Sequence, residues 1–161
     1  MLKKILKNPK MVIILGSYRS GRKTFSEKFP YKIFYKEDFI RKLGGGIYSE
    51  KNEKQGKEEF YKQLKKSLRF KENLVIIEEG NKKFLYNIIS EAKRLGYEIH
   101  LYLLEQKLDF VLAKNQEMSL RGYAAHIKES IIEASRKTAK RAFNFIKNFI
   151  PPQNVHVLSF L

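Results

Sequence analysis

The sequence predicts an α/β fold of three layers, in which a five-stranded, mainly parallel sheet carries helices on both faces. Two of its apolar runs, MVIIL and LVII, are continuously apolar, as expected of parallel strands buried on both sides. Helical patterns lie between the apolar runs, so strands and helices alternate along the chain. Short runs rich in β-branched residues give the expected strands: 11–16, 31–35, 74–79, 98–104 and 154–160.

The segments between these strands have helical patterns. RKTFSEKF follows the first strand, and EDFIRKLG follows the second and stops at Gly44. KEEFYKQLKKSLRF places its apolar residues on one helical face, and KKFLYNIISEAKRLG ends at Gly96. The stretch 44–57 is glycine-rich and charged, and we expect a mobile loop there. A long helical region over 106–149, interpreted as a lid, ends before Pro151.

Composition limits the class of protein. The chain has 161 residues, which suits one domain over 1–161 with a single core. No apolar run approaches the roughly 20 residues of a membrane span. The N-terminal MLKKILKNPK lacks the apolar stretch of a signal peptide and is expected to lie on the surface before the first strand. The expected compartment is the cytoplasm. Cysteine is absent, which excludes disulfides and thiolate metal sites.

The net charge of +16 indicates a partner that carries phosphate, whether a nucleotide, a sugar nucleotide or nucleic acid. Lysines are spread along the chain with glutamates between them, as in EEFYKQLKKSLRFKEN. This spacing favours solvated helix faces over a dedicated nucleic-acid surface. Nucleic acid therefore remains an open but less favoured partner.

A phosphate-binding loop is predicted in IILGSYRSGRKTF. Gly16 and Gly21 stand where such a loop has its first and last glycines, after a buried strand and before a helix. Backbone N–H groups of a loop of this kind converge on a phosphate. Arg22 occupies the usual lysine position, and Lys23-Thr24 come one place late. Arginine is bulkier and planar, so this exchange is not conservative.

Two alignments of the loop are possible. In one, Arg22 replaces the lysine and Lys23 the hydroxyl residue, so a magnesium-binding hydroxyl comes from Thr24 or Ser20. In the other, the loop is one residue longer and Lys23-Thr24 form the usual pair. Lys23 at a metal-facing position would repel magnesium and slow the chemistry. The expected cofactors are ATP or GTP with Mg²⁺, bound by Gly16, Ser17, Arg19, Ser20, Gly21, Arg22, Lys23 and Thr24.

Charged residues near the ends of other strands are candidate catalytic or metal-binding residues. LVIIEEG ends a strand in two carboxylates; strand alternation turns only one toward the site, and Glu79 is favoured as a magnesium ligand with Thr24. Asp38 follows the second strand and is either a catalytic base or a first-turn helix acid, the latter favoured by local features. Arg121, and then Arg136, are candidates to neutralise a transferring phosphoryl group. The three histidines are isolated, which argues against a metal site of histidines.

The segments GSYRSGRKTF, IFYKEDFIRKL, NLVIIEEGNKKFLYNIISEAKRLGYEIHLYLLEQKLDFVLAKN and RGYAAHIKESI together resemble the zeta toxin family of P-loop kinases. The resemblance implies a P-loop NTPase fold and ATP-dependent phosphorylation of UDP-N-acetylglucosamine, with an antitoxin as partner. It also implies that Asp38 activates the sugar hydroxyl and that Arg22 takes the place of the loop lysine. Other roles that it implies are phosphate contacts by the lid arginines Arg121 and Arg136 and substrate contacts by Glu79, Asn81 and Lys83.

Three functions are consistent with the sequence. The first is a zeta-type kinase that phosphorylates UDP-N-acetylglucosamine or a related phosphorylated small molecule. The second is a nucleoside or nucleotide kinase with another acceptor, which would use the same residues. The third is a catalytically silent basic module that binds nucleic acid or a partner protein. Saturable, magnesium-dependent ATP binding would distinguish a kinase from the third class.

Overall fold

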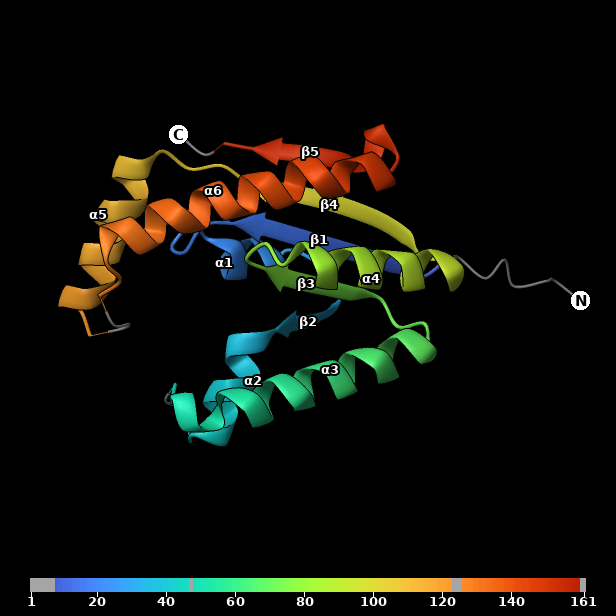
Figure 1. Ribbon diagram of the computed structural model, residues 1–161, viewed down its shortest axis with the longest axis horizontal. Helices are drawn as coiled ribbons and strands as arrows, with labels where there is room; N and C mark the ends of the chain where they lie inside the picture. The colour runs from blue at the N-terminus through green and yellow to red at the C-terminus, as the bar shows by residue number, and fades with distance from the viewer. Residues whose placement is uncertain (1–7, 47, 123–125, 160–161) are drawn as a thin grey trace, which may run out of the picture.

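The computed structural model describes residues 8–46, 48–122 and 126–159. Over these residues the strands form one parallel sheet in the order β2-β3-β1-β4-β5 (Figure 1). The α/β prediction is confirmed, and every strand pair is parallel. Residues 1–7 of the expected surface-lying lead-in and Phe160 of the expected last strand fall outside the described residues. The strands are β1 Lys10–Gly16, β2 Lys32–Tyr35, β3 Leu74–Glu78, β4 Glu98–Leu104 and β5 Val155–Leu158.

Helices connect the strands as the sequence predicts, with differences at their ends. The first helix stops at Ser26 because i→i+3 bonds from Lys28 to Phe25 and from Phe29 to Ser26 tighten the chain into turns. In the described part of 106–149, one α-helix ends at Leu120, Gly122 has a φ of +70°, and another α-helix begins at Glu129. Among the described residues, no helix is long and apolar enough to cross a membrane. The α-helices are α1 Arg22–Ser26, α2 Lys36–Leu43, α3 Glu53–Arg69, α4 Lys82–Arg94, α5 Leu108–Leu120 and α6 Glu129–Ile146.

The segment 44–57, expected to be an irregular loop, is helical over its second half. A 3-10 turn spans Glu50–Asn52 and α3 begins at Glu53. Gly56 lies inside α3, and a Cβ built on it would come within 2.6 Å of Cγ1 of Ile40. This glycine therefore allows α3 to approach α2 closely, whereas its sequence context suggested a loop.

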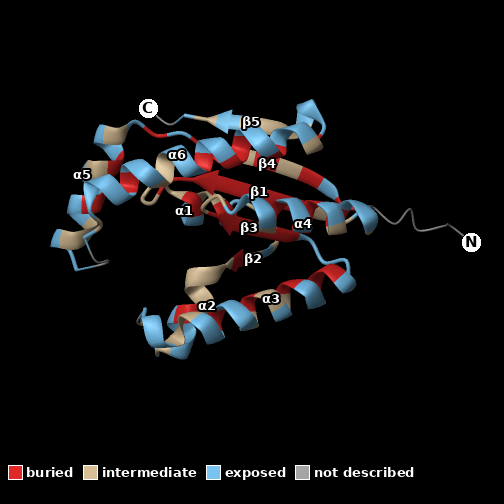
Figure 2. Ribbon diagram, viewed as in Figure 1, coloured by how far each residue is buried: buried red, intermediate tan, exposed pale blue. Residues whose placement is uncertain are grey.

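The two faces of the sheet are covered unequally. Side chains of α3, α4 and α6 pack with Met11, Ile13 and Leu15 of β1 in the larger core, and Figure 1 shows α4 and α6 in front of the sheet. On the other face, Val12 and Ile14 pack under aromatic side chains around the short helix α1. Figure 2 shows β1 and β3 buried throughout most of their length. The second half of α6 is thus part of the core, and the lid interpretation stays a prediction for α5 and the first half of α6.

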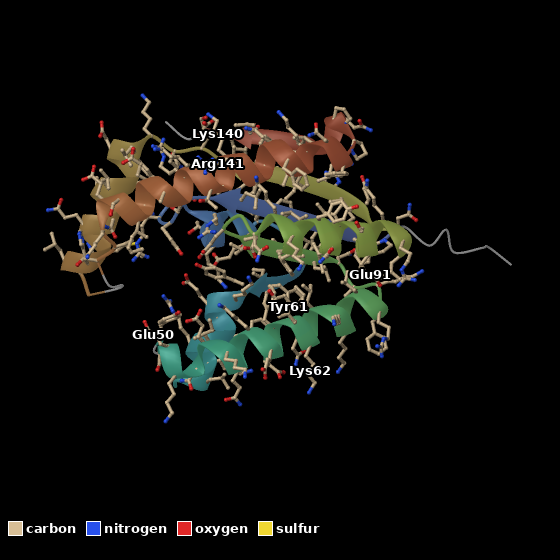
Figure 3. The ribbon with its side chains drawn as sticks, in the orientation of Figure 1. Glu50, Tyr61, Lys62, Glu91, Lys140 and Arg141 are labelled. Atoms are coloured by element: carbon tan, nitrogen blue, oxygen red, sulfur yellow. The ribbon has the colours of Figure 1, made fainter. Side chains whose placement is uncertain are left out.

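An aromatic cluster holds α3 against the sheet and α4. The ring of Phe60 lies 6.0 Å from Phe34 on β2 and 6.0 Å from Phe84 on α4. Tyr61 of α3 reaches toward α4, where its ring centroid lies 5.4 Å from that of Phe84 (Figure 3). Figure 3 also shows charged side chains such as Lys62 on the outside of the molecule. Phe60 is completely buried, so the attachment of α3 depends on it.

Replacing Phe60 by alanine should lower the free energy of unfolding by about 3–5 kcal/mol, because the change leaves a cavity among packed rings. Phe70, at the end of α3, is 65% exposed and serves as the matched control. The Phe70→Ala variant should change the free energy by about 0.5 kcal/mol or less. Urea denaturation followed by circular dichroism measures both values. A Phe60→Ala variant as stable as Phe70→Ala would contradict the role of the cluster.

Candidate nucleotide-binding site

The loop after β1, residues 16–23 and hereafter the phosphate loop, lies at the carboxyl edge of the sheet, where ligands of parallel α/β sheets bind. Left-handed backbone angles turn the chain at Arg19, with φ +62°, and Gly21, with φ +89°. Gly16 is needed for space, since a Cβ there would lie 2.6 Å from Oγ of Ser20 and 3.2 Å from the carbonyl oxygen of Leu104. The predicted sequence of buried strand, glycine loop and helix is present.

The phosphate loop is held in place by its own residues and by α6. The hydroxyl of Ser20 donates to the carbonyl oxygen of Ser17 at 2.7 Å, and the N–H of Tyr18 donates to Oγ of Ser135 at 3.2 Å. Helix α1 begins at Arg22, so the N–H groups of its first residues have no carbonyl acceptor within the helix. Loops that bind phosphate use N–H groups in this position.

Arg22, which replaces the usual loop lysine, is buried with 5% of its surface exposed. Its Nη1 donates to the backbone carbonyl oxygen of Glu78 at 3.0 Å. The guanidinium carbon lies 5.9 Å from the ring centroids of both Tyr18 and Tyr35. Arg22 therefore joins the phosphate loop to the ends of β2 and β3. Arginine has five N–H donors, so this bond leaves others for a phosphate.

Lys23 forms an ion pair with Asp38, the predicted catalytic base on α2. Both side chains are about half exposed, so the pair adds little to stability. Asp38 lies in the first turn of α2, as the alternative interpretation of this residue expects. Sequence analysis assigned Lys23 to phosphate binding and Asp38 to base catalysis. In the structure the two side chains are in direct contact.

A cavity of about 440 Å³ opens beside the phosphate loop, between the ends of β2 and β3 and the start of α3. We call it the acceptor cavity. Asp38 does not line it, whereas its neighbour Glu37 does, with its carboxylate 3.6 Å from Nη2 of Arg41. Sequence analysis missed Glu37, although the Glu37-Asp38 pair was a visible signal. The lining residues are Tyr18, Arg19, Tyr35, Lys36, Glu37, Ile40, Arg41, Tyr48, Glu53, Lys57, Ile77, Glu78, Glu79 and Ile127.

Both carboxylates at the end of β3 line the acceptor cavity, so the prediction that only one faces the site is wrong. The strand ends at Glu78, and Glu79 lies in a bend where strand alternation no longer holds. Glu78 is buried, lies 3.4 Å from Nζ of Lys36 and accepts from the N–H of Asn81. Gly80, with φ +140°, permits the bend, and its position against Thr138 of α6 leaves no room for a Cβ.

Two tyrosines that line the acceptor cavity have raised pKa values. Burial raises the pKa of Tyr18 above its usual value, and the negative charge of Glu79, to which it hydrogen-bonds, raises it further. Burial also raises the pKa of Tyr35; Arg22 offsets part of this effect, and Glu37 adds to it. The cavity thus offers both phenol donors and carboxylate acceptors to a polar ligand.

The two predicted magnesium ligands line different hollows of the surface. Thr24 lines a hollow between α1 and α5, whereas Glu79 lines the acceptor cavity. The carboxylate of Glu78 is already bound by Lys36. Within the described ranges, no group of three or more histidine, aspartate or glutamate side chains is arranged to hold a metal ion. Magnesium binding by Thr24 and Glu79 therefore stays a prediction.

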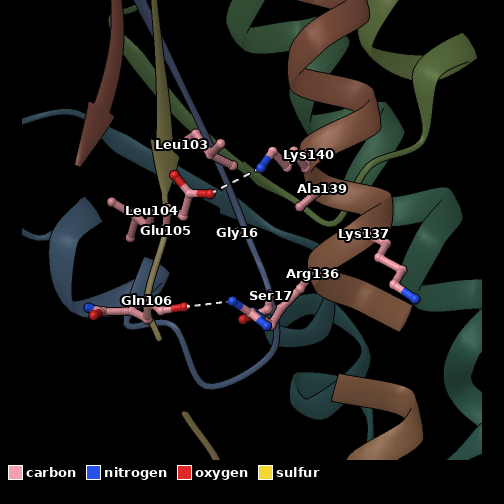
Figure 4. A pocket seen from close by; sticks show the side chains of 10 residues that line it. All are labelled: Gly16, Ser17, Leu103, Leu104, Glu105, Gln106, Arg136, Lys137, Ala139 and Lys140. Carbon is pink, nitrogen blue, oxygen red and sulfur yellow. Dashed lines mark hydrogen bonds and ion pairs between the residues drawn. The ribbon is translucent and has the colours of Figure 1, made fainter. Parts of the chain in front are cut away.

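The remaining predicted residues divide by position. Asn81 caps α4, accepting the N–H of Phe84 at 3.0 Å, and Lys83 is exposed on the same helix. Arg121 ends α5 and pairs with Glu117 on the surface. Arg136 lies beside the phosphate loop, where its Nη2 donates to the backbone carbonyl oxygen of Gln106 at 3.1 Å (Figure 4). Of the two expected lid arginines, only Arg136 lines a hollow of the phosphate loop.

Comparisons with known proteins identify the fold. No protein-family model and no curated protein matches the sequence. Among solved structures, the Pnkp1/Rnl/Hen1 RNA repair complex matches with a TM-score of 0.71 and 15% identity, over 89% of this chain and 48% of that chain. The AvrRxo1-ORF1:-ORF2 complex with ATP matches at 0.70 and 12%, over 96% and 55%. The PezAT toxin-antitoxin system of Streptococcus pneumoniae matches at 0.66 and 15%, over 95% and 69%.

Other matching structures are a putative kinase, a sugar kinase and a gluconokinase. The chain spans about half the length of the first two structures described above. At such low identities the likeness concerns the fold alone. The protein has the fold of P-loop kinases, and its glycine loop lies at the carboxyl edge of the parallel sheet.

The raised pKa of Tyr35 makes stability depend on pH. Above pH of about 10 the unfolded chain loses the phenol proton first, so it binds fewer protons than the folded chain. The free energy of unfolding should therefore fall as pH rises beyond that value. Tyr35→Phe removes this component, and the fall should become shallower. Urea titrations at a series of pH values measure both slopes, and equal slopes in the two proteins would contradict the burial of this phenol.

Proposed function

We propose that the protein is a kinase that binds the phosphates of ATP or GTP in the phosphate loop and transfers the γ-phosphate to a small molecule in the acceptor cavity. The observation that carries this proposal is the direct contact between the two sites, since Tyr18 and Arg19 of the phosphate loop also line the cavity. A phosphoryl group and an acceptor hydroxyl held there would lie next to each other, which is the main requirement for phosphoryl transfer.

The acceptor cavity carries charges of both signs, since the cations of Lys36, Arg41 and Lys57 each pair with a carboxylate in the cavity. We propose that a phosphate of the acceptor competes for these cations, and that the carboxylates and phenols bind sugar hydroxyls. UDP-N-acetylglucosamine has both kinds of group and is the acceptor that the zeta toxin resemblance suggests. The PezAT and AvrRxo1-ORF1:-ORF2 complexes support a protein partner, which we propose to be an antitoxin.

The chemistry needs one carboxylate to take the proton of the acceptor hydroxyl. The hydroxyl oxygen then attacks the γ-phosphorus, the bond to the bridging oxygen breaks, and the nucleoside diphosphate leaves. Asp38 is the proposed base; because it lies outside the lining of the acceptor cavity and pairs with Lys23, it must leave Lys23 to reach the acceptor hydroxyl. Lys23 is then released toward the transferred phosphoryl group. Arg136, beside the phosphate loop, is the proposed residue for neutralising charge on the nucleotide.

A second candidate is a nucleotide-binding module without transfer. The observation that favours it is that both cations of the loop motif are engaged elsewhere: Arg22 with the carbonyl oxygen of Glu78, and Lys23 with Asp38. A module of this kind would bind ATP but would not consume it with any acceptor.

The direct test is consumption of ATP by the purified protein in magnesium buffer, with and without UDP-N-acetylglucosamine. Consumption should depend on the acceptor, and Asp38→Ala should lower the turnover number at least about 100-fold, the usual contribution of a general base. ATP affinity, measured by calorimetry, should change much less. Asp109→Ala, an exposed acid in the first turn of α5, is the matched control and should retain full turnover.

A Glu37→Gln variant extends this test. Loss of turnover in Glu37→Gln with retention in Asp38→Ala would assign the base to the acid that lines the cavity. ATP binding without consumption, over UDP-N-acetylglucosamine and a panel of nucleosides and nucleotides, would exclude transfer to these acceptors and support the module.

A further inference from the structure

The helices α4 and α6 together form a surface that carries both cations and aromatic rings. They are in contact, and Figure 1 shows both in front of the sheet. On each helix the side chains of this surface recur at every fourth position, which places them on one side of the helix. We call this surface the α4–α6 face. It consists of Lys82 and Tyr86 of α4, Lys137, Arg141 and Phe145 of α6, and Phe149 of the 3-10 turn that follows α6.

The aromatic rings of the α4–α6 face contact one another across the two helices. The ring centroid of Phe149 lies 5.4 Å from that of Tyr86 and 5.4 Å from that of Phe145. Nζ of Lys82 lies 5.9 Å from the centroid of Phe145, so a cation adjoins the rings. Tyr86 is 45% exposed and Phe145 is 40% exposed. These rings therefore leave part of their surface open to a flat ligand, and aromatic rings favour stacked or edge-to-face partners.

The positive charge of the α4–α6 face is not balanced by nearby acids. The sequence has no aspartate or glutamate after Glu133. Among the residues that the structure describes, Lys82, Lys137 and Arg141 form no ion pair with a carboxylate. Glu91 of α4 is itself paired with an arginine of the same helix. Lysines and glutamates alternate elsewhere in the chain, but here the fold places an acid-free part of α6 beside the cationic start of α4. The face therefore attracts an anion.

We propose that the α4–α6 face binds a single strand of nucleic acid, with its phosphates on the cations and its bases stacked on the rings. Surfaces of this kind combine positive charge along the backbone with aromatic side chains under the bases. From Lys137 to Phe149 the face extends roughly 18 Å, which matches about five phosphates of a stacked strand. This inference goes beyond the proposed function and does not depend on it.

Two features favour a single strand over other polyanions. A duplex hides the faces of its bases within the stack, so the exposed rings would gain nothing from it. Helices that lie on a lipid surface present a broad apolar stripe, whereas the α4–α6 face offers partly exposed rings among cations.

The test uses fluorescence anisotropy with labelled oligo(dT) and oligo(U) of about ten nucleotides, titrated at several salt concentrations. Tyr86→Ala and Phe145→Ala should each weaken binding about 5-fold or more and leave the salt dependence unchanged, because only stacking is lost. The double variant Lys82→Gln/Arg141→Gln should also weaken binding. It should lower the slope of log K against log salt by about 1.4, which is 0.7 for each phosphate contact.

Two matched controls separate this face from the general charge of the protein. The double variant Lys62→Gln/Lys66→Gln removes the same charge from exposed positions of α3, and Phe70→Ala removes an exposed ring at the end of that helix. Both should bind the oligonucleotides within about 2-fold of the wild-type protein, which is less than the loss of one stacked base. Thermal melting confirms that each variant is folded. The affinity for ATP should be the same in all of these variants, which separates this inference from the proposed function.

Three results would overturn the proposal. Equal losses in the α3 controls and in the variants of the α4–α6 face would show attraction by the net charge of +16 alone. Ring variants that bind as the wild-type protein does, or an equal affinity for a hairpin duplex, would exclude stacking. Binding to phosphatidylserine vesicles without binding to either oligonucleotide would assign the face to a membrane surface.

Discussion

The site depends on the position of β1 at the centre of the sheet. This strand pairs with β3 on one side and β4 on the other, and both its faces are buried. The register sets Leu15 opposite Glu78 and Gly16 opposite Leu104. The phosphate loop, the carboxylates at the end of β3 and Gln106 after β4 are therefore fixed at one edge of the sheet. Because a slip of register would turn every side chain to the other face, the packing of the core also determines the geometry of the site.

Arg22 connects the phosphate loop to the ends of the strands β2 and β3. Its bond to the carbonyl oxygen of Glu78 joins the phosphate loop to β3, and its position between Tyr18 and Tyr35 joins it to β2. A lysine is a shorter point charge and could not make these contacts in the same plane. Arginine at this position thus ties the loop to β3, and the proposed phosphate contact is left to the remaining guanidinium N–H groups and the backbone.

Much of the fold could be predicted from the sequence because its signals are local. Continuous runs of β-branched residues identify the strands that are buried on both faces. The glycine-containing loop comes directly after the first of these strands in the sequence. The start of α3 could not be predicted, since Gly56 looks like a loop residue until Ile40 is placed against it. The extent of α1 depended on turns that no periodic pattern reveals.

The site was harder to predict because its contacts join distant segments. Neither the ion pair of Lys23 with Asp38 nor the burial of Arg22 can be inferred from spacing. Strand alternation failed at Glu79 because the strand had already ended. Local pattern identified the loop, and tertiary packing determined which side chains surround it.

The central claim is that residues 16–23 bind the phosphates of a nucleotide through backbone N–H groups. An NMR titration of ¹⁵N-labelled protein with a non-hydrolysable ATP analogue and magnesium tests it most directly. The account predicts saturable shifts of the amide signals of Ser20, Gly21 and Arg22 that exceed those of the rest of the backbone. Saturation of binding with these three amides unmoved, and with the largest shifts elsewhere on the basic surface, would contradict it.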